Sequence, residues 1–183
     1  MILRPSRDLR RLQGGSPISD PEAAAAGLRV LLGLRAVGVG RALNLGIVEF
    51  DRPSQAALER PADDRTPFAL HLQCPFRIAY EGRIILGSGD IAWREADVRG
   101  AQAAGGERTM YDFMADHVDR AFAEVRPAVI AVDVTPLGDL RVELEHQFTV
   151  QAFPVVSGRK EAWRFLERAG EHVVFPPEDE LYG

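Results

Sequence analysis

Cysteine and long hydrophobic runs are scarce in this sequence, and each scarcity excludes a class of protein. The 183-residue chain has one cysteine, Cys74, so no disulfide can form within it, which is typical of a reducing compartment. No apolar run approaches the roughly 20 residues that a membrane-spanning helix needs. The N-terminal arginines precede no apolar segment, so we expect no secretory signal and no membrane association. These features together predict a cytoplasmic protein.

Positive charge is also in short supply. The chain has 22 basic against 27 acidic residues, and its formal net charge is −5. Because wide contact with a phosphate backbone depends on clustered positive charge, we expect no nucleic-acid partner.

The remaining composition is ordinary for a globular protein, and the length suits one domain that folds without a metal or disulfide. We predict a flexible basic arm over 1–19, a single domain over 20–176 and an acidic tail over 177–183.

The clearest structural pattern lies between Pro67 and Ser88. Apolar side chains occupy every even position from Phe68 to Tyr80, which predicts a strand with one face on the core. Pro75 interrupts this run and cannot donate to a ladder, so we expect a bend, a bulge or an edge there. Glu81-Gly82 is typical of a two-residue turn, after which the chain returns as the partner strand.

The remaining patterns predict an α+β fold with a mostly antiparallel sheet of about eight strands and about three helices. Its first four strands are expected to form a meander. The segment from Gly87 to Arg108 is glycine-rich, and we expect it to be a loop. Helices are predicted over 19–32, over 109–126 with a capping box at Thr109 and Asp112, and over 158–169; further strands are predicted over 34–40, 43–50, 128–134, 140–145, 148–156 and 172–175.

Residues with reactive side chains form no recognised motif. Cys74 shares the apolar strand face, which favours a buried, inert thiol over a nucleophile. The four histidines, His71, His117, His146 and His172, lack metal-site spacing, and the glycine-rich stretches lack the context of a phosphate-binding loop. We therefore expect no metal, no cofactor and no catalytic residue.

Two groups of carboxylates leave alternatives open. Asp112, Asp116 and Asp119 follow helical spacing, while Glu143 and Glu145 share a strand face. Either group can bind a cation or do acid–base chemistry, or it can form a solvated face. Because Arg120 is spaced to pair with Asp116, the solvated face is favoured for the first group.

Part of the chain resembles a group of small bacterial proteins that have no established activity. The resemblance rests on Leu70 to Ile78, on the following hairpin with Gly87-Ser88, and on the turn from Arg41 to Asn44. It implies a bacterial α+β protein and carries over no catalytic residues. By analogy alone, proteins of this kind sometimes act as immunity or partner-binding proteins.

These observations predict a non-enzymatic binding protein whose partner is another protein. The predicted contact surface consists of His71, Gln73 and Arg77, on the polar face of the long strand, together with Trp93 from the glycine-rich segment. A structural explanation of the same row is that a helix covers it. The alternative function is a small-molecule enzyme or ligand binder with a pocket between sheet and helix.

Overall fold

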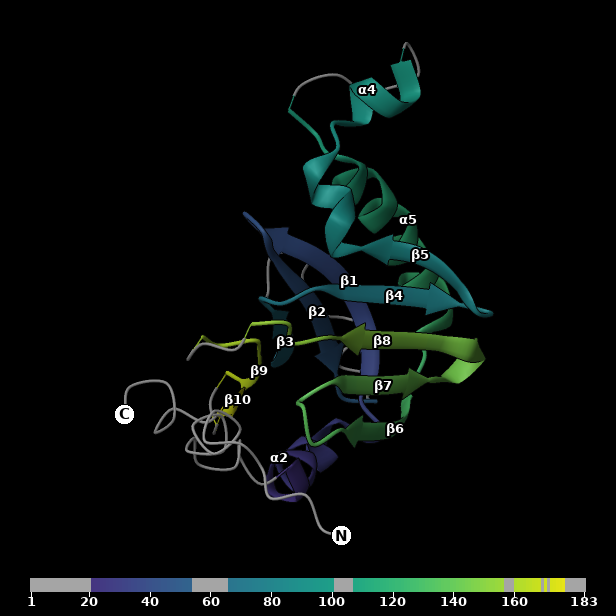
Figure 1. Ribbon diagram of the computed structural model, residues 1–183. Helices are drawn as coiled ribbons and strands as arrows, with labels where there is room; N and C mark the ends of the chain where they lie inside the picture. The colour runs from purple at the N-terminus through teal and green to yellow at the C-terminus, as the bar shows by residue number, and fades with distance from the viewer. Residues whose placement is uncertain are drawn as a thin grey trace, which may run out of the picture.

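Two antiparallel sheets and one long helix enclose the hydrophobic core in the computed structural model (Figure 1). The structure describes residues 21–53, 66–100, 107–156, 160–168, 170 and 172–176. The predicted basic arm over 1–19 and acidic tail over 177–183 lie outside these residues.

The ten strands of the described chain form two sheets of five, in which every pairing is antiparallel. The strand order is β1-β2-β3-β9-β10 in the first sheet and β5-β4-β8-β7-β6 in the second. The strands are β1 (Arg35–Ala42), β2 (Leu45–Asp51), β3 (Phe68–Leu72), β4 (Phe76–Tyr80), β5 (Arg83–Gly87), β6 (Val129–Val134), β7 (Leu140–Leu144), β8 (Phe148–Ala152), β9 (Trp163–Glu167) and β10 (His172–Phe175). The predicted α+β class is confirmed, with two five-stranded sheets in place of one sheet of about eight strands.

The helical elements are short except for one. The α-helices of the described residues are α2 (Pro21–Gly27), α4 (Glu95–Arg99) and α5 (Met110–Val125), and the 3₁₀ turns are η1 (Leu28–Leu31), η2 (Ser88–Ala92) and η4 (Glu145–Gln147). Gly33, two residues after η1, has a φ of 82°, the left-handed conformation in which many helices end.

Pro75 marks the point where the chain leaves one sheet and enters the other. The predicted long strand is split into β3, which pairs with β2 and β9, and β4, which pairs with β5 and β8. The N–H groups of Gln73 and Cys74 both donate to the carbonyl of Ala162, and Phe153 N–H donates to the carbonyl of Pro75. The interruption at Pro75 is therefore confirmed. The predicted four-stranded meander is wrong, because β4, the second half of its third strand, and β5, its fourth strand, belong to the second sheet.

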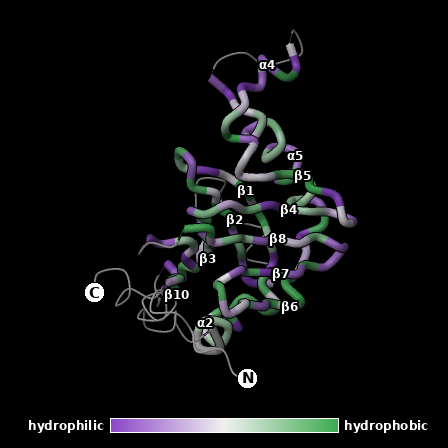
Figure 2. Tube along the Cα trace, viewed as in Figure 1, coloured by the Kyte–Doolittle hydropathy of each residue, from purple (hydrophilic) through white to green (hydrophobic). Residues whose placement is uncertain are grey.

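The two sheets also meet along a hydrogen-bonded seam between β1 and β6. Gly33 N–H donates to the carbonyl of Val129 at 2.9 Å, and Val129 N–H donates to the carbonyl of Leu34 at 2.9 Å. Arg35 and Ala128 form an isolated antiparallel bridge beside these bonds. Because the sheets are joined here and at Pro75, their apolar faces enclose one core. Figure 2 shows hydrophobic and hydrophilic residues alternating along the strands, as a sheet with one buried face requires.

Helix α5 packs on β1 and β5, the edge strands of the two sheets (Figure 1). The predicted capping box is present, since Asp112 N–H donates to the Thr109 hydroxyl and Thr109 N–H donates to the Asp112 carboxylate. The residues that α5 buries are Tyr111, Ala115, Val118 and Phe122. The helix predicted over 109–126 is thus confirmed, and Val125 near its C-terminal end is exposed.

The segment from Trp163 to Glu167 is a strand, so the helix predicted over 158–169 is wrong. Trp163 and Phe165 are fully buried on one face of β9, while Arg164 and Leu166 alternate with them on the other. Pairing with both β3 and β10 satisfies the backbone of this segment. Aromatic side chains at period two suit a half-buried strand, and the tertiary context overrides the weak helical pattern.

Two short elements lie within the segment from Gly87 to Arg108, which the sequence predicted to be a loop. They are η2 and α4, and residues 101–106 are outside the described part. The buried carboxylate of Glu95 anchors α4, because it accepts hydrogen bonds from Arg99 at 2.5 Å and Arg108 at 3.2 Å. A buried charge of this kind is tolerated only when it is paired.

Two glycines with the same positive φ allow a matched test of the core. Gly33 and Gly138 both have a φ of 82°, but a Cβ atom would meet nothing within 4 Å at Gly33 and would lie 1.9 Å from the Phe175 ring at Gly138. We expect Gly33→Ala to lower the free energy of unfolding by about 1 kcal/mol and Gly138→Ala by about 3 kcal/mol or more. Urea denaturation measures both, and equal losses would contradict the close packing of Phe175 on Gly138.

Candidate functional site

A groove of about 430 Å³ opens between α5 and the second sheet. Clefts that bind small molecules have volumes of roughly 300–1,000 Å³ and apolar walls with a few polar groups. The groove has this character. Its apolar lining consists of Tyr80, Ile85, Met114, Val118, Ala121, Val125 and Phe148, and its polar lining consists of His117, Glu124 and His146.

The helical wall follows from the sequence of α5. Met114, Val118, Ala121 and Val125 succeed one another at intervals of four, three and four residues, so they share one face of the helix. Val118 is buried at the floor of the groove, whereas Val125 is 38% exposed. Ala121 contributes only a methyl group between them, which leaves space that a larger side chain would fill.

The sheet wall is built by one aromatic pair and one β-bulge. Tyr80 and Phe148 are partners across β4 and β8, and their ring centroids lie 4.6 Å apart. The register of β4 with β5 shifts between Ile84 and Leu86, which leaves Ile85 as the extra residue. A bulge redirects the side chains that flank it. As a result Ile85 lines the groove next to the buried Leu86, while Ile84 is exposed.

Helix α5 supplies two of the polar groups. His117 Nδ1 lies 2.8 Å from the carbonyl of Phe113, and because a carbonyl only accepts, Nδ1 carries the proton. The other ring nitrogen, Nε2, is left for a ligand. Glu124 lies two helical turns after His117, on the same face of α5, and it also lines the groove.

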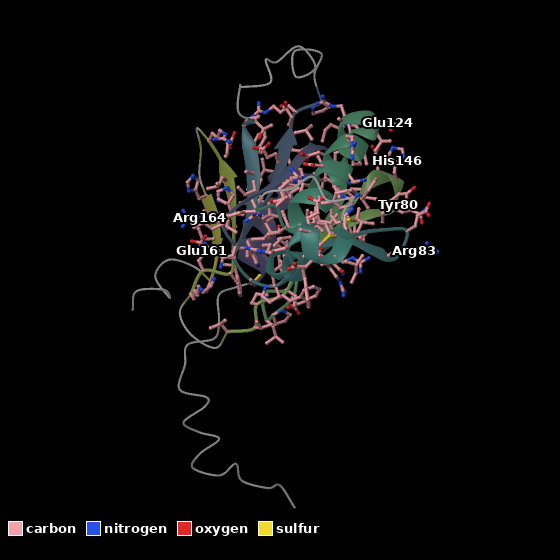
Figure 3. All side chains as sticks on the ribbon, turned by 90° about the horizontal axis from the view of Figure 1, so that it is seen from above. Tyr80, Arg83, Glu124, His146, Glu161 and Arg164 are labelled. Atoms are coloured by element: carbon pink, nitrogen blue, oxygen red, sulfur yellow. The ribbon has the colours of Figure 1, made fainter. Side chains whose placement is uncertain are left out.

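The third polar group, His146, lies in the turn between β7 and β8. His146 and Gln147 have φ values of 58° and 62°, a left-handed conformation that costs free energy for residues other than glycine. The carbonyl of Gln147 accepts a hydrogen bond from Glu81 N–H, which ties this turn to the hairpin turn after β4. Tyr80, Glu124 and His146 consequently lie on the same side of the molecule (Figure 3).

Two of the four residues predicted to form a contact surface lie together on the first sheet. His71 is the cross-strand partner of Arg164, and Gln73 Nε2 donates to the Glu161 carboxylate at 2.6 Å. The same carboxylate accepts two bonds from Arg164, whose guanidinium also lies 3.5 Å from His172 Nδ1. In Figure 3 Glu161 and Arg164 lie on the opposite side of the molecule from Tyr80 and His146.

The other two predicted residues lie elsewhere. Arg77 belongs to β4 in the second sheet, where it donates to Gln151 at 2.7 Å and stacks over the Phe153 ring. Trp93 follows η2, and its side chain is 61% exposed. Because the chain changes sheets at Pro75, His71, Gln73 and Arg77 do not form one continuous row.

Most of the carboxylates named from the sequence pair with cations of the chain itself, while Asp119 accepts a hydrogen bond from the backbone N–H of Val39. Burial alone would raise the pKa of Asp112, but its hydrogen bonds to Arg41 lower the pKa far below the ordinary value. The Asp116 carboxylate pairs with Arg108, whereas Arg120 donates to the backbone carbonyl of Asp116. Glu143 and Glu145 pair with Arg141 and Arg35, respectively. These contacts favour a structural role for both groups.

The lining of the groove combines apolar walls with three polar side chains. Within the described ranges of the chain, no three or more metal-ligating side chains are arranged to hold a metal ion. The apolar walls can exclude water from a ligand body, and His117, Glu124 and His146 can orient a polar head group. Sequence patterns missed this site. The one available signal was the position of His117 in the predicted helix, next to the buried Val118, whereas the positions of His146 and Tyr80 depend on the turn and sheet pairings.

Comparison with protein-family models, with curated proteins and with solved structures finds no match to this chain. Among the helices of the described residues, none has the length and apolar character needed to cross a bilayer.

Cys74 offers a test of the corner at Pro75. Burial raises the pKa of its thiol to about 11, so that at pH 8 about one thiol in a thousand is ionised. We expect Ellman's reagent to modify Cys74 slowly in the folded protein and rapidly in urea. Rapid modification without denaturant would contradict the packing of this side chain against the core.

His71 makes the stability of the first sheet depend on pH. Burial lowers its pKa below the ordinary value of 6.5, and the neighbouring cations Arg164 and Arg168 act in the same direction. As the pH falls through 6.5, the unfolded chain takes up a proton that folded His71 does not, so protonation favours unfolding. We expect His71→Gln to reduce the loss of stability between about pH 7 and pH 5. Urea midpoints across this range measure the effect, and parallel curves for the two proteins would contradict it.

Proposed function

We propose that this protein binds a small amphipathic molecule in the groove between α5 and the second sheet. The observation that carries the proposal is an apolar cleft of about 430 Å³ whose polar lining is confined to His117, Glu124 and His146. The ligand places its apolar body between Met114, Ala121 and Phe148 and its polar head beside these three side chains. This is the alternative function inferred from the sequence, a ligand binder with a pocket between sheet and helix.

Exposed apolar side chains at the groove supply a driving force for binding. Tyr80 and Val125 are each more than a third exposed although both line the cleft. A ligand that covers them removes apolar surface from water, which contributes about 25 cal/mol for each square ångström buried. Protein interiors are otherwise closely packed, so an open apolar cleft of this size calls for an occupant.

The hypothesis of a protein partner that contacts His71, Gln73, Arg77 and Trp93 stays a prediction. The exposure of the Trp93 side chain is the observation that supports it. A partner bound there would contact the segment between β5 and α5, so blocking the groove at Ala121 would leave that contact unchanged.

A fluorescence titration tests the proposed function. The neutral dye N-phenyl-1-naphthylamine has a size that the groove accommodates and becomes fluorescent when water is excluded. We expect saturable binding of one dye per chain, which Ala121→Phe weakens at least tenfold because the new ring fills the cleft.

The same helix provides a matched control. Ala123 is exposed and does not line the groove, so Ala123→Phe should leave dye binding unchanged. Val125→Phe at the exposed end of the groove provides a second blocking variant should Ala121→Phe lower the melting temperature. Equal dye binding by all three variants, or no saturable binding by the unmodified protein, would refute the proposal.

A further inference from the structure

Two of the three polar groups of the groove, His117 and Glu124, present hydrogen-bond acceptors. His117 Nδ1 donates to the carbonyl of Phe113 at 2.8 Å, so in the neutral ring Nε2 has only a lone pair to offer. Glu124 is a carboxylate, and no hydrogen bond or ion pair joins it to another described residue. Tyr80 and Phe148 add two aromatic rings to the lining, with centroids 4.6 Å apart.

An acceptor-lined cleft is complementary to a donor. We infer that the groove selects a ligand whose apolar body carries a protonated amine, an inference that rests on the proposed ligand-binding function. The ammonium group donates to the Glu124 carboxylate and to His117 Nε2, and the aromatic rings of Tyr80 and Phe148 line the same groove, where a cation can contact them. His146 can turn either ring nitrogen toward the head group, because a neutral imidazole has one donor and one acceptor.

The charges around the groove agree with this choice of ligand. Glu81 and Glu145 on the adjoining turns do not line the groove, and Glu145 pairs with Arg35, so Glu124 is the carboxylate of the lining. The neighbouring cation, Arg83, is exposed on β5 on the same side of the molecule, and it is not a lining residue (Figure 3). An anionic head group would therefore meet an unpaired carboxylate.

Competition against the bound dye tests the head group directly. Hexylammonium, hexanol and hexanoate have the same apolar chain and differ in the charge of the head group. At neutral pH we expect hexylammonium to displace the dye most effectively and hexanoate least. Glu124→Gln should weaken hexylammonium roughly tenfold and leave hexanol unchanged, because only the ammonium uses the carboxylate.

Glu143→Gln is the matched control, since it removes one negative charge from β7 without altering the groove, and it should leave all three affinities unchanged. If the dye binds but hexanoate displaces it best, or if Glu124→Gln weakens hexanol as much as hexylammonium, the inference is wrong while the proposed function stands. If the dye itself does not bind, the proposed function fails and the inference fails with it.

Discussion

The architecture depends on the break in backbone pairing at Pro75. A long amphipathic strand would otherwise continue in a single sheet, but proline has no N–H with which to extend the ladder. The chain turns there, and its free backbone groups bond to Ala162 before β9 and to Phe153 after β8. One corner thereby anchors strands of both sheets. Each sheet keeps an apolar face toward the shared interior. The hydrogen bonds at Leu34 and Val129 join the two sheets a second time, between the edge strands β1 and β6.

Helix α5 packs on the edge strands β1 and β5 and closes the hydrophobic core on that side of the molecule. Polar contacts fix it on β1, including the bond from the Tyr111 hydroxyl to the carbonyl of Gly40 and the paired Arg41 and Asp112. On the side of β5 its contact is looser, because Ala121 is small and the bulge at Ile85 moves the edge strand. The groove is thus a consequence of close packing on one edge and incomplete packing on the other.

Backbone groups of α5 and of the turn between β7 and β8 position the two histidines at the groove. His117 is oriented by the helix carbonyl one turn before it, and His146 is oriented by a turn in the left-handed region. Neither arrangement needs a ligand to be present, so the site is formed in advance. Preformed sites bind with a smaller loss of conformational entropy than sites that must be ordered. Such a site fits the binding function proposed for the groove.

Local patterns in the sequence were sufficient where the structure depends on neighbouring residues. The capping box at Thr109, the turn at Glu81-Gly82 and the interruption at Pro75 each involve backbone groups only a few residues apart, and all three were predicted. The sequence alone therefore determined α5, the hairpin and the α+β class. Tertiary structure decided the rest. Trp163 and Phe165 belong to a strand only because β3 and β10 supply its hydrogen-bond partners. Strand β3 lies far earlier in the sequence, and β10 is the strand that follows β9. The groove depends in the same way on pairings between β4, β5 and β8 and on how α5 rests against them, and no local pattern encodes a space between elements that meet only in the folded chain.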